Sequence, residues 1–199
     1  TILEHFHFSY TAVCSMPAYG LDRKYGKTAR DLRNVTTRAA AKKIATNLAD
    51  ELREKLPSLD AFQEHFAGLT YSYGDDSGKR LIQYFFEKYE AFLRKSTELV
   101  PSDITLEHIS SQKFSSKNFD QIGNLIPLAE KLNGIAAAKN FADKLIVYKD
   151  SQFRVTKDFV NRYDSKDTWT TSDVEERSKL LGKIAFEKVF RVTASYFDK

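Results

Sequence analysis

Three short runs with different periodicities follow one another near the middle of this chain. The first reads I-T-L-E-H-I over residues 104–109 and carries Glu107 beside His108. The second reads I-G-N-L-I-P-L with Asn124 near its start, and the third, A-E-K-L-N-G, carries Asn133. Alternation of apolar and polar residues is typical of a half-buried strand. The order therefore predicts a small β-hairpin followed by a helix, with four polar residues at fixed spacing.

The rest of the chain has mainly helical patterns. Before Pro57, apolar residues recur at three- and four-residue steps, namely Ala41, Ile44, Ala45, Leu48 and Leu52. This spacing indicates one face of a helix, and a proline ends such a helix. Ser58 is placed to cap the next helix, and Ser172 with Glu175 forms an S-x-x-E capping box that predicts the start of the last helix.

A bulky apolar stripe of Leu81, Phe85, Tyr89 and Phe92 has helical spacing and predicts a packed core rather than a cofactor pocket. Further helices are expected at about 129–138, 140–149 and 156–162. We predict an α+β fold of predominantly α-helical character, in which helices surround a small β-hairpin–helix motif.

A polar connector over residues 96–103 contains Pro101 and separates two parts of the sequence. We expect a helical subdomain at 1–95 and a core carrying the hairpin motif, with the C-terminal helices, at 96–199. The chain begins with Thr1 rather than methionine. We therefore expect one compact domain cut from a larger protein.

Composition excludes several classes of protein. The single cysteine, Cys14, excludes an internal disulfide and a cysteine-rich zinc site. No apolar run approaches the roughly 20 residues that a membrane span requires. The start of the chain lacks a signal-peptide pattern, so we expect a cytoplasmic protein. The net charge of +4 is compatible with nucleic acid as a partner, but many other proteins share it.

The four polar residues suit hydrolysis of a phosphodiester bond. An imidazole that titrates near neutral pH can take a proton from water, which makes His108 the candidate general base. A hard cation such as Mg²⁺ (or Mn²⁺) would neutralise the phosphate, with Glu107 and Asn133 as candidate oxygen ligands. The amide of Asn124 can brace the hairpin by bonding across it. These roles make His108 and Asn124 the predicted catalytic residues, and Glu107 and Asn133 the predicted metal ligands.

Each residue also has an ordinary structural interpretation. A histidine at a strand end is usually a surface or packing residue, and Glu107 could be a solvated charge. Asn124 follows a glycine and could belong to a turn, whereas Asn133 precedes a glycine and could cap a helix. Adjacent strand residues point to opposite faces, which argues against Glu107 and His108 sharing one site unless the strand bends there.

At these motifs the chain resembles a known family. The segments E-H-I-x-x-Q, I-G-N-L and L-N are similar to the HNH-type (ββα-metal) nuclease domain at the C-terminus of GmrSD-like modification-dependent restriction enzymes, also found in SspE-type phage-defence proteins. The likeness continues through Lys139-Asn140-Phe141, Lys144, Tyr148, Ser151 and Glu176-Arg177. The family often has a proline two residues after the histidine and a tryptophan in the following loop, where this chain has Ser110-Ser111 and Phe119.

The resemblance implies a metal-dependent DNA endonuclease or nickase domain of a prokaryotic anti-phage restriction system. It also implies a partner, an N-terminal ParB-like NTPase or sensor domain in the same protein or in a partner subunit, acting with this domain on duplex DNA. The expected phosphate contacts are Lys131, Lys139, Lys144 and Arg154, although a single lysine more often lies on a solvated helix face. Two alternatives remain open, a non-catalytic DNA- or partner-binding module with a vestigial motif, and an RNA-cleaving nuclease.

Overall fold

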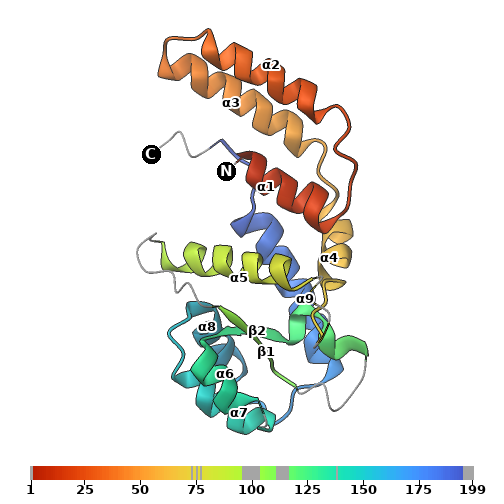
Figure 1. Ribbon diagram of the computed structural model, residues 1–199, viewed down its shortest axis with the longest axis vertical. Coiled ribbons are helices and arrows are strands. Elements are labelled where there is room, and N and C mark those ends of the chain that lie inside the picture. The colour runs from red at the N-terminus through yellow and green to blue at the C-terminus, as the bar shows by residue number, and fades with distance from the viewer. Residues whose placement is uncertain are drawn as a thin grey trace. The chain divides into compact units, whose positions relative to one another are not determined.

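A computed structural model describes residues 2–72, 74, 76, 78–95, 104–110, 117–137 and 139–194. The described residues are mainly helical, with one two-stranded antiparallel sheet (Figure 1), which confirms the predicted fold class. The chain divides into two compact units, one formed by residues 1–62 with 186–199 and the other by residues 63–185. The predicted connector at 96–103 lies outside the described residues, and the division at residue 95 stays a prediction.

The first unit consists of helices around a small core. Its elements are α1 (Ile2–His7), the π-helix η1 (Phe8–Val13), α2 (Leu21–Arg33) and α3 (Arg38–Arg53). Its buried core contains Phe6, Leu21, Ala49, Leu52, Val192 and Ala194. Thr37 caps α3 by accepting a hydrogen bond from the Ala40 amide, and the helix ends before Pro57 as predicted.

The next two helices show one correct prediction and one error. Ser58 accepts a hydrogen bond from the Ala61 amide at the start of α4 (Leu59–Ala67), as expected for a cap. In α5 (Lys79–Arg94), the face defined by Ile82, Phe85, Phe86 and Tyr89 is buried, whereas Phe92 is 45% exposed. The buried face of α5 is therefore rotated relative to the predicted one. This helix has two overlapping apolar faces, and tertiary packing selects between them.

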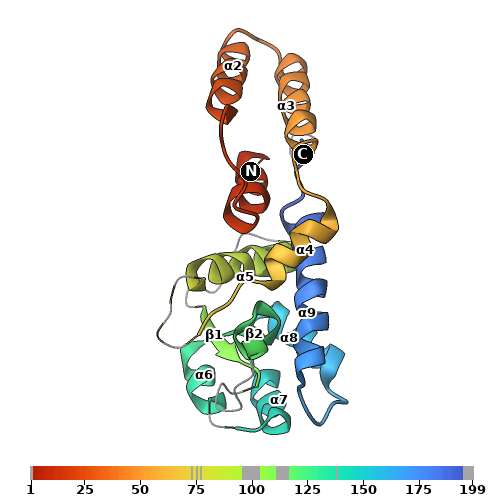
Figure 2. The same ribbon diagram turned by 90° about the vertical axis from the view of Figure 1, so that its right-hand side faces the viewer.

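The second unit holds the hairpin motif. Its elements after α5 are β1 (Thr105–His108), the 3-10 helices η3 (Lys117–Asp120) and η4 (Ile122–Asn124), β2 (Leu125–Leu128), α6 (Glu130–Ala136), α7 (Phe141–Lys149), α8 (Arg154–Tyr163) and α9 (Thr171–Ile184). In β1 and β2, Glu107 pairs with Ile126 and His108 with Leu125. In two views (Figures 1 and 2) the sheet lies between α5 on one side and α6 and α7 on the other.

A buried apolar cluster fixes the hairpin against these helices. It includes Ile126 and Leu128 of β2, Tyr148 of α7 and Phe159 of α8. The hydroxyl of Thr156 in α8 also donates to the Pro127 carbonyl at 2.6 Å. The order strand, strand, helix thus matches the order expected from the sequence.

The last helix begins earlier than the sequence suggested. The capping box uses Thr170 and Asp173, not Ser172 and Glu175. Both pairs have the required spacing, but the Asp173 carboxylate also forms an ion pair with Lys166, which fixes the earlier start. Among the described helices, none is long and apolar enough to cross a membrane.

Candidate active site

His108 is the last residue of β1, and its ring is held by the segment before α5. Its Nε2 lies 2.9 Å from the main-chain carbonyl oxygen of Tyr71, and the two rings stack with centroids 5.5 Å apart. A carbonyl oxygen can only accept a hydrogen bond, so Nε2 must carry the proton. The proton-accepting nitrogen of the neutral imidazole is therefore Nδ1.

The surroundings of His108 favour its neutral form. Burial of the imidazole lowers the pKa of His108, whereas the hydrogen bond to Tyr71 and the charge of Asp120 act in the opposite direction. The ammonium of Lys144 lowers this pKa further. A histidine with a lowered pKa is uncharged at neutral pH, which is the form that accepts a proton. No motif in the sequence indicated Asp120 as a neighbour of His108.

Glu107 precedes His108 in β1, where adjacent side chains alternate between the two faces of the strand. Its carboxylate is only 5% exposed and lies 2.5 Å from the ammonium of Lys144 in α7. Lys144 is itself 1% exposed and also donates to the main-chain carbonyl of His108. One buried lysine therefore holds the end of β1 at two consecutive residues.

The buried pair has perturbed electrostatics. Burial raises the pKa of Glu107, and the nearby charge of Lys144 only partly offsets this effect. The pKa of Tyr148 is raised well above its usual value by burial and by the neighbouring Glu107 carboxylate. The predicted contact of Lys144 with DNA phosphate does not fit this placement, because its ammonium is buried and already has a carboxylate partner.

Asn124 holds together the two ends of the segment that follows β1. Its amide oxygen accepts from the Ser110 amide at 2.9 Å, and its amide nitrogen donates to the carbonyls of Ser110 at 2.9 Å and Phe119 at 2.7 Å. The side chain is fully buried. Its amide therefore bonds across the hairpin, as a brace would. The intervening residues 111–116 lie outside the described residues.

Helix α9 fixes the turn that carries Asn124. A Cβ at Gly123 would lie 2.0 Å from the Val174 carbonyl oxygen, so only glycine permits this close approach. Arg177 donates to the carbonyls of Gly123 at 2.6 Å and Leu125 at 2.8 Å, and Ser178 accepts from the Gly123 amide. Burial lowers the pKa of Arg177 to about 10, which leaves it charged at neutral pH.

Asn133 ties α6 to β1 on the face opposite His108. Its amide nitrogen donates to Thr105 Oγ1 at 2.8 Å and to the Leu106 carbonyl at 3.3 Å. Since side chains alternate along a strand, Thr105 and Glu107 share a face and His108 occupies the other. The structure thus places the two predicted metal ligands on one face of β1 and the predicted base on the other.

Binding of Mg²⁺ by the predicted ligand pair, Glu107 and Asn133, stays a prediction, and two features of the structure argue against such an ion serving His108. An ammonium already neutralises the Glu107 carboxylate, and the side chains of Glu107 and His108 point to opposite faces of the strand. Over residues 2–194, outside the gaps in the description, no group of three or more His, Cys, Asp or Glu side chains could hold a metal ion.

The other predicted DNA contacts lie on the surface. Lys131 of α6, Lys139 between α6 and α7, and Arg154 at the start of α8 are all exposed. The main-chain amide of Arg154 donates to the buried carboxylate of Glu90 at 2.9 Å. This contact uses the backbone of Arg154 and not its guanidinium. Contact of these three side chains with DNA stays a prediction.

Comparison with known proteins identifies one family. The model of the family described as GmrSD restriction endonucleases, C-terminal domain, matches residues 56–184, which is well over half of the chain. The match includes every residue of the site around His108, and it excludes α1, α2 and α3. No curated protein and no solved structure shows a significant match to the chain.

Proposed function

The chain belongs to the family of GmrSD restriction endonuclease C-terminal domains, and from this we propose that it hydrolyses phosphodiester bonds of DNA with His108 as the general base. The single observation that carries the assignment is the hydrogen bond between His108 Nε2 and the Tyr71 carbonyl. This bond favours the tautomer with the proton on Nε2, in which Nδ1 is the nitrogen that can accept a proton from the attacking water.

Three contacts support this role by positioning the imidazole. Lys144 bonds to the main-chain carbonyl of His108, and the Tyr71 ring stacks on the imidazole. Asn124 closes the segment that begins at Ser110, two residues beyond the base. A base held in this way loses little orientational freedom when it acts, which lowers the barrier for proton transfer. Lys144 and Asn124 are thus positioning residues in this proposal.

A requirement for Mg²⁺ or Mn²⁺ stays a prediction from family resemblance. When bound, such an ion would stabilise charge on the phosphoryl group. Because Glu107 and Asn133 do not share a face with His108, the proposed role of His108 does not depend on a metal held by these two residues. Glu107 instead balances the charge of Lys144 inside the protein.

We propose duplex DNA as the substrate and an anti-phage restriction system as the biological setting. Cutting of one strand, as by a nickase, is the expected outcome for a single site. A ParB-like NTPase or sensor domain, in the same protein or in a partner subunit, is the proposed source of target recognition.

The test is cleavage of supercoiled plasmid by the full chain, with Mg²⁺, with Mn²⁺ and with a chelator. We expect His108→Ala to slow nicking by about a hundredfold or more, the range lost when a general base is removed. His65→Ala is the matched control, since His65 is exposed on α4 and lies outside the site. Its nicking rate should equal that of the wild type.

Nicking by His108→Ala at the wild-type rate would refute the role of this residue. Parallel assays with a labelled RNA of matched length separate DNA cleavage from RNA cleavage. Salt-sensitive DNA binding without cleavage of either polymer, in any of these conditions, would favour the non-catalytic binding module instead.

A further inference from the structure

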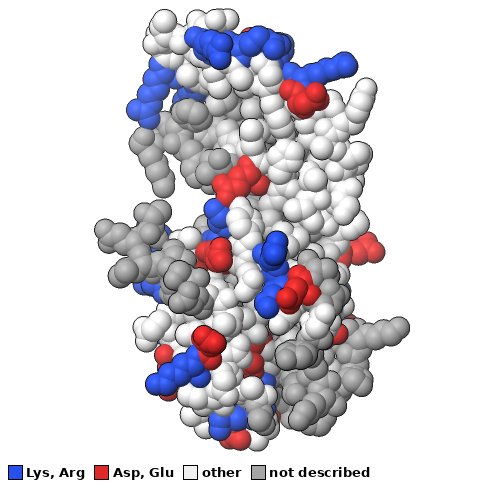
Figure 3. All heavy atoms as spheres, viewed as in Figure 1, with Lys and Arg blue, Asp and Glu red and all other residues white. Residues whose placement is uncertain are grey.

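Helices α2 and α3 carry the positive charge of the whole chain. Residues 21–53 contain nine Lys and Arg against four Asp and Glu, a net charge of +5. All remaining residues contain 22 basic and 23 acidic side chains, a net charge of −1. Within residues 23–49 the imbalance is stronger, because eight basic side chains face a single acid, Asp31. Figure 3 shows Lys and Arg gathered over these two helices.

Only one end of this helical hairpin is anchored in a core. Leu21, Ala49 and Leu52 are buried in the cluster of the first unit. From residue 26 to residue 44, by contrast, no residue of the hairpin is buried. This part buries little apolar surface, so its basic side chains lie on a polar, solvated arm rather than around a core. The side chains of this part therefore form a solvent-exposed surface.

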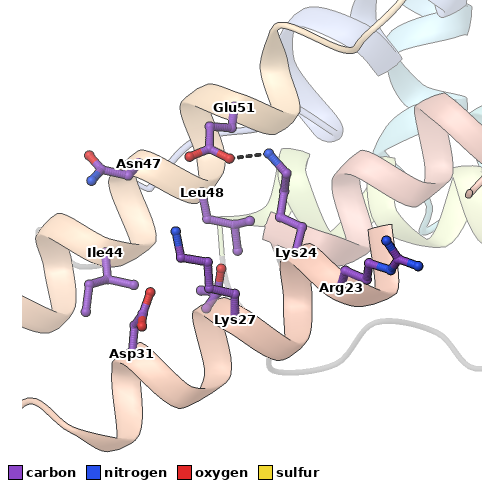
Figure 4. Close-up of a pocket in the computed structure, with 9 residues that line it drawn as sticks. Arg23, Lys24, Lys27, Asp31, Ile44, Asn47, Leu48 and Glu51 are labelled. Carbon is purple, nitrogen blue, oxygen red and sulfur yellow. Dashed lines mark hydrogen bonds and ion pairs between the residues drawn. The ribbon is translucent and has the colours of Figure 1, made fainter. Parts of the chain in front are cut away.

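Three basic side chains at the far end of the arm are exposed to solvent. Arg30, Arg33 and Lys43 are exposed, and none of them forms an ion pair with another described residue. Near the anchored end, Lys24 of α2 pairs with Glu51 of α3 across the hairpin, as Figure 4 shows. Glu51 therefore joins the two helices near the anchored end, whereas the charges of Arg30, Arg33 and Lys43 face solvent.

A shallow groove between the helices adds to the positive surface. It has a volume of about 420 Å³, and its lining combines cations, acids, polar and aliphatic side chains: Arg23, Lys24, Lys27, Thr28 and Asp31 of α2, and Ile44, Asn47, Leu48 and Glu51 of α3. In Figure 4, the side chains of Lys24 and Lys27 extend from α2 toward α3. Three of its lining side chains are cations and two are carboxylates, so the lining carries a net charge of +1, and Ile44 and Leu48 form its apolar part.

We propose that the α2–α3 hairpin is a second nucleic-acid-binding surface, which binds the phosphate backbone of duplex DNA without reading its sequence. Clustered Lys and Arg side chains supply this kind of affinity by releasing counterions from the duplex. An anionic membrane is a poorer fit, because surface helices that bind lipid carry bulky apolar side chains on one face. Here the exposed large apolar residue of the hairpin is Leu32, at 38%.

This surface lies outside the residues 56–184 that define the family domain. It therefore adds affinity that the family's site does not supply, and it would retain the substrate between cleavage events. The proposal does not depend on the chemistry of His108, since it concerns binding alone. Both can be tested in the same protein, with separate readouts.

The test measures binding of a short labelled duplex of random sequence to the full chain carrying His108→Ala, with a chelator present so that nothing is cut. The test variant adds Arg30→Glu, Arg33→Glu and Lys43→Glu. The matched control adds Lys179→Glu, Lys183→Glu and Lys188→Glu, three exposed lysines of residues 171–189. Both triple variants change the net charge by the same amount.

We expect the hairpin triple variant to bind at least about tenfold more weakly and to lower the salt-dependence slope of log K by about 2 to 3. The control triple variant should stay within about threefold of its parent. Neutral replacements by Gln at Arg30, Arg33 and Lys43, which keep helix propensity, should give an intermediate loss and confirm that folding is intact.

Equal weakening by the two triple variants would overturn the proposal, because overall charge would then explain the binding. Unchanged binding by the hairpin variant would overturn it as well. Binding of the parent to phosphatidylserine vesicles or to polyglutamate, with loss of that binding but not of DNA binding in the hairpin variant, would assign the surface to a lipid or protein partner instead.

Discussion

The α2–α3 hairpin and the site around His108 use charged residues in opposite ways. In the hairpin, Arg30, Arg33 and Lys43 are exposed and have no carboxylate partner among the residues that the structure describes. In the site, Lys144 is 1% exposed and bonds to the Glu107 carboxylate and to the main-chain carbonyl of His108. A buried charge without a partner is costly, so the lysine of the site must be satisfied internally.

A basic residue near a proposed site is therefore not, by itself, evidence of contact with substrate. Lys144 stands closer in sequence to His108 than any hairpin residue does, yet its charge serves the internal geometry of β1. The hairpin cations lie far away in the sequence and face solvent. Burial, not proximity in sequence, separates the two uses.

Removing one charge from each region is the sharpest test of this comparison. Lys144→Met should lower the free energy of unfolding by about 3–5 kcal/mol, because Glu107 is left buried without its partner. Lys43→Met is the matched control, and an exposed replacement should stay within about 0.5 kcal/mol. Chemical denaturation of both variants at neutral pH gives these values.

The same pair of variants has an internal check. The pKa of Glu107 is raised by burial, and loss of Lys144 raises it further, so the unpaired carboxylate is tolerated better once it is protonated. The destabilisation by Lys144→Met should therefore shrink as the pH falls toward 5, and Glu107→Gln in the same chain should recover part of it. A loss of stability that is equal for Lys43→Met and Lys144→Met would break the comparison.

Much of the fold follows from local patterns in the sequence. Period-two alternation over 104–109 and a proline near the end of the second run indicated the hairpin, and the serine at 58 indicated a helix start. The capping box of α9 was misplaced by two residues, because Thr170–Asp173 and Ser172–Glu175 have the same spacing. Local spacing could not choose between them without the additional pair with Lys166.

The site was less predictable, because its decisive contacts join residues far apart in the chain. The bond between His108 and Tyr71 spans 37 residues and uses a main-chain carbonyl, which any residue type can supply. The pair of Lys144 and Glu107 also spans 37 residues. No pattern within one segment encodes such contacts. The amide of Asn124, by contrast, bonds to main chain only five and fourteen residues away, and its predicted role in catalysis stays a prediction.

A smaller effect is expected from the titration of His108 itself. Its pKa is lowered in the folded protein, so the unfolded chain binds more protons as the pH falls below the ordinary value of 6.5. Stability is thus complete above that pH and declines below it, by at most about 1.4 kcal/mol per pH unit. Unfolding free energies measured for the wild type and His108→Gln should diverge in slope below 6.5.

A His108→Gln variant with the same pH dependence as the wild type would show that burial does not depress the protonation of this imidazole. The site around His108 would then no longer show the effect of burial on a titratable group that distinguishes it from the hairpin.

The most direct test of the central claim is the pH dependence of single-turnover plasmid nicking with DNA saturated by protein. If the neutral imidazole of His108 is the base, the rate should rise with pH and level off, with a midpoint below the usual histidine value of 6.5. A rate that does not change across this range, or a midpoint above 6.5, would contradict the claim.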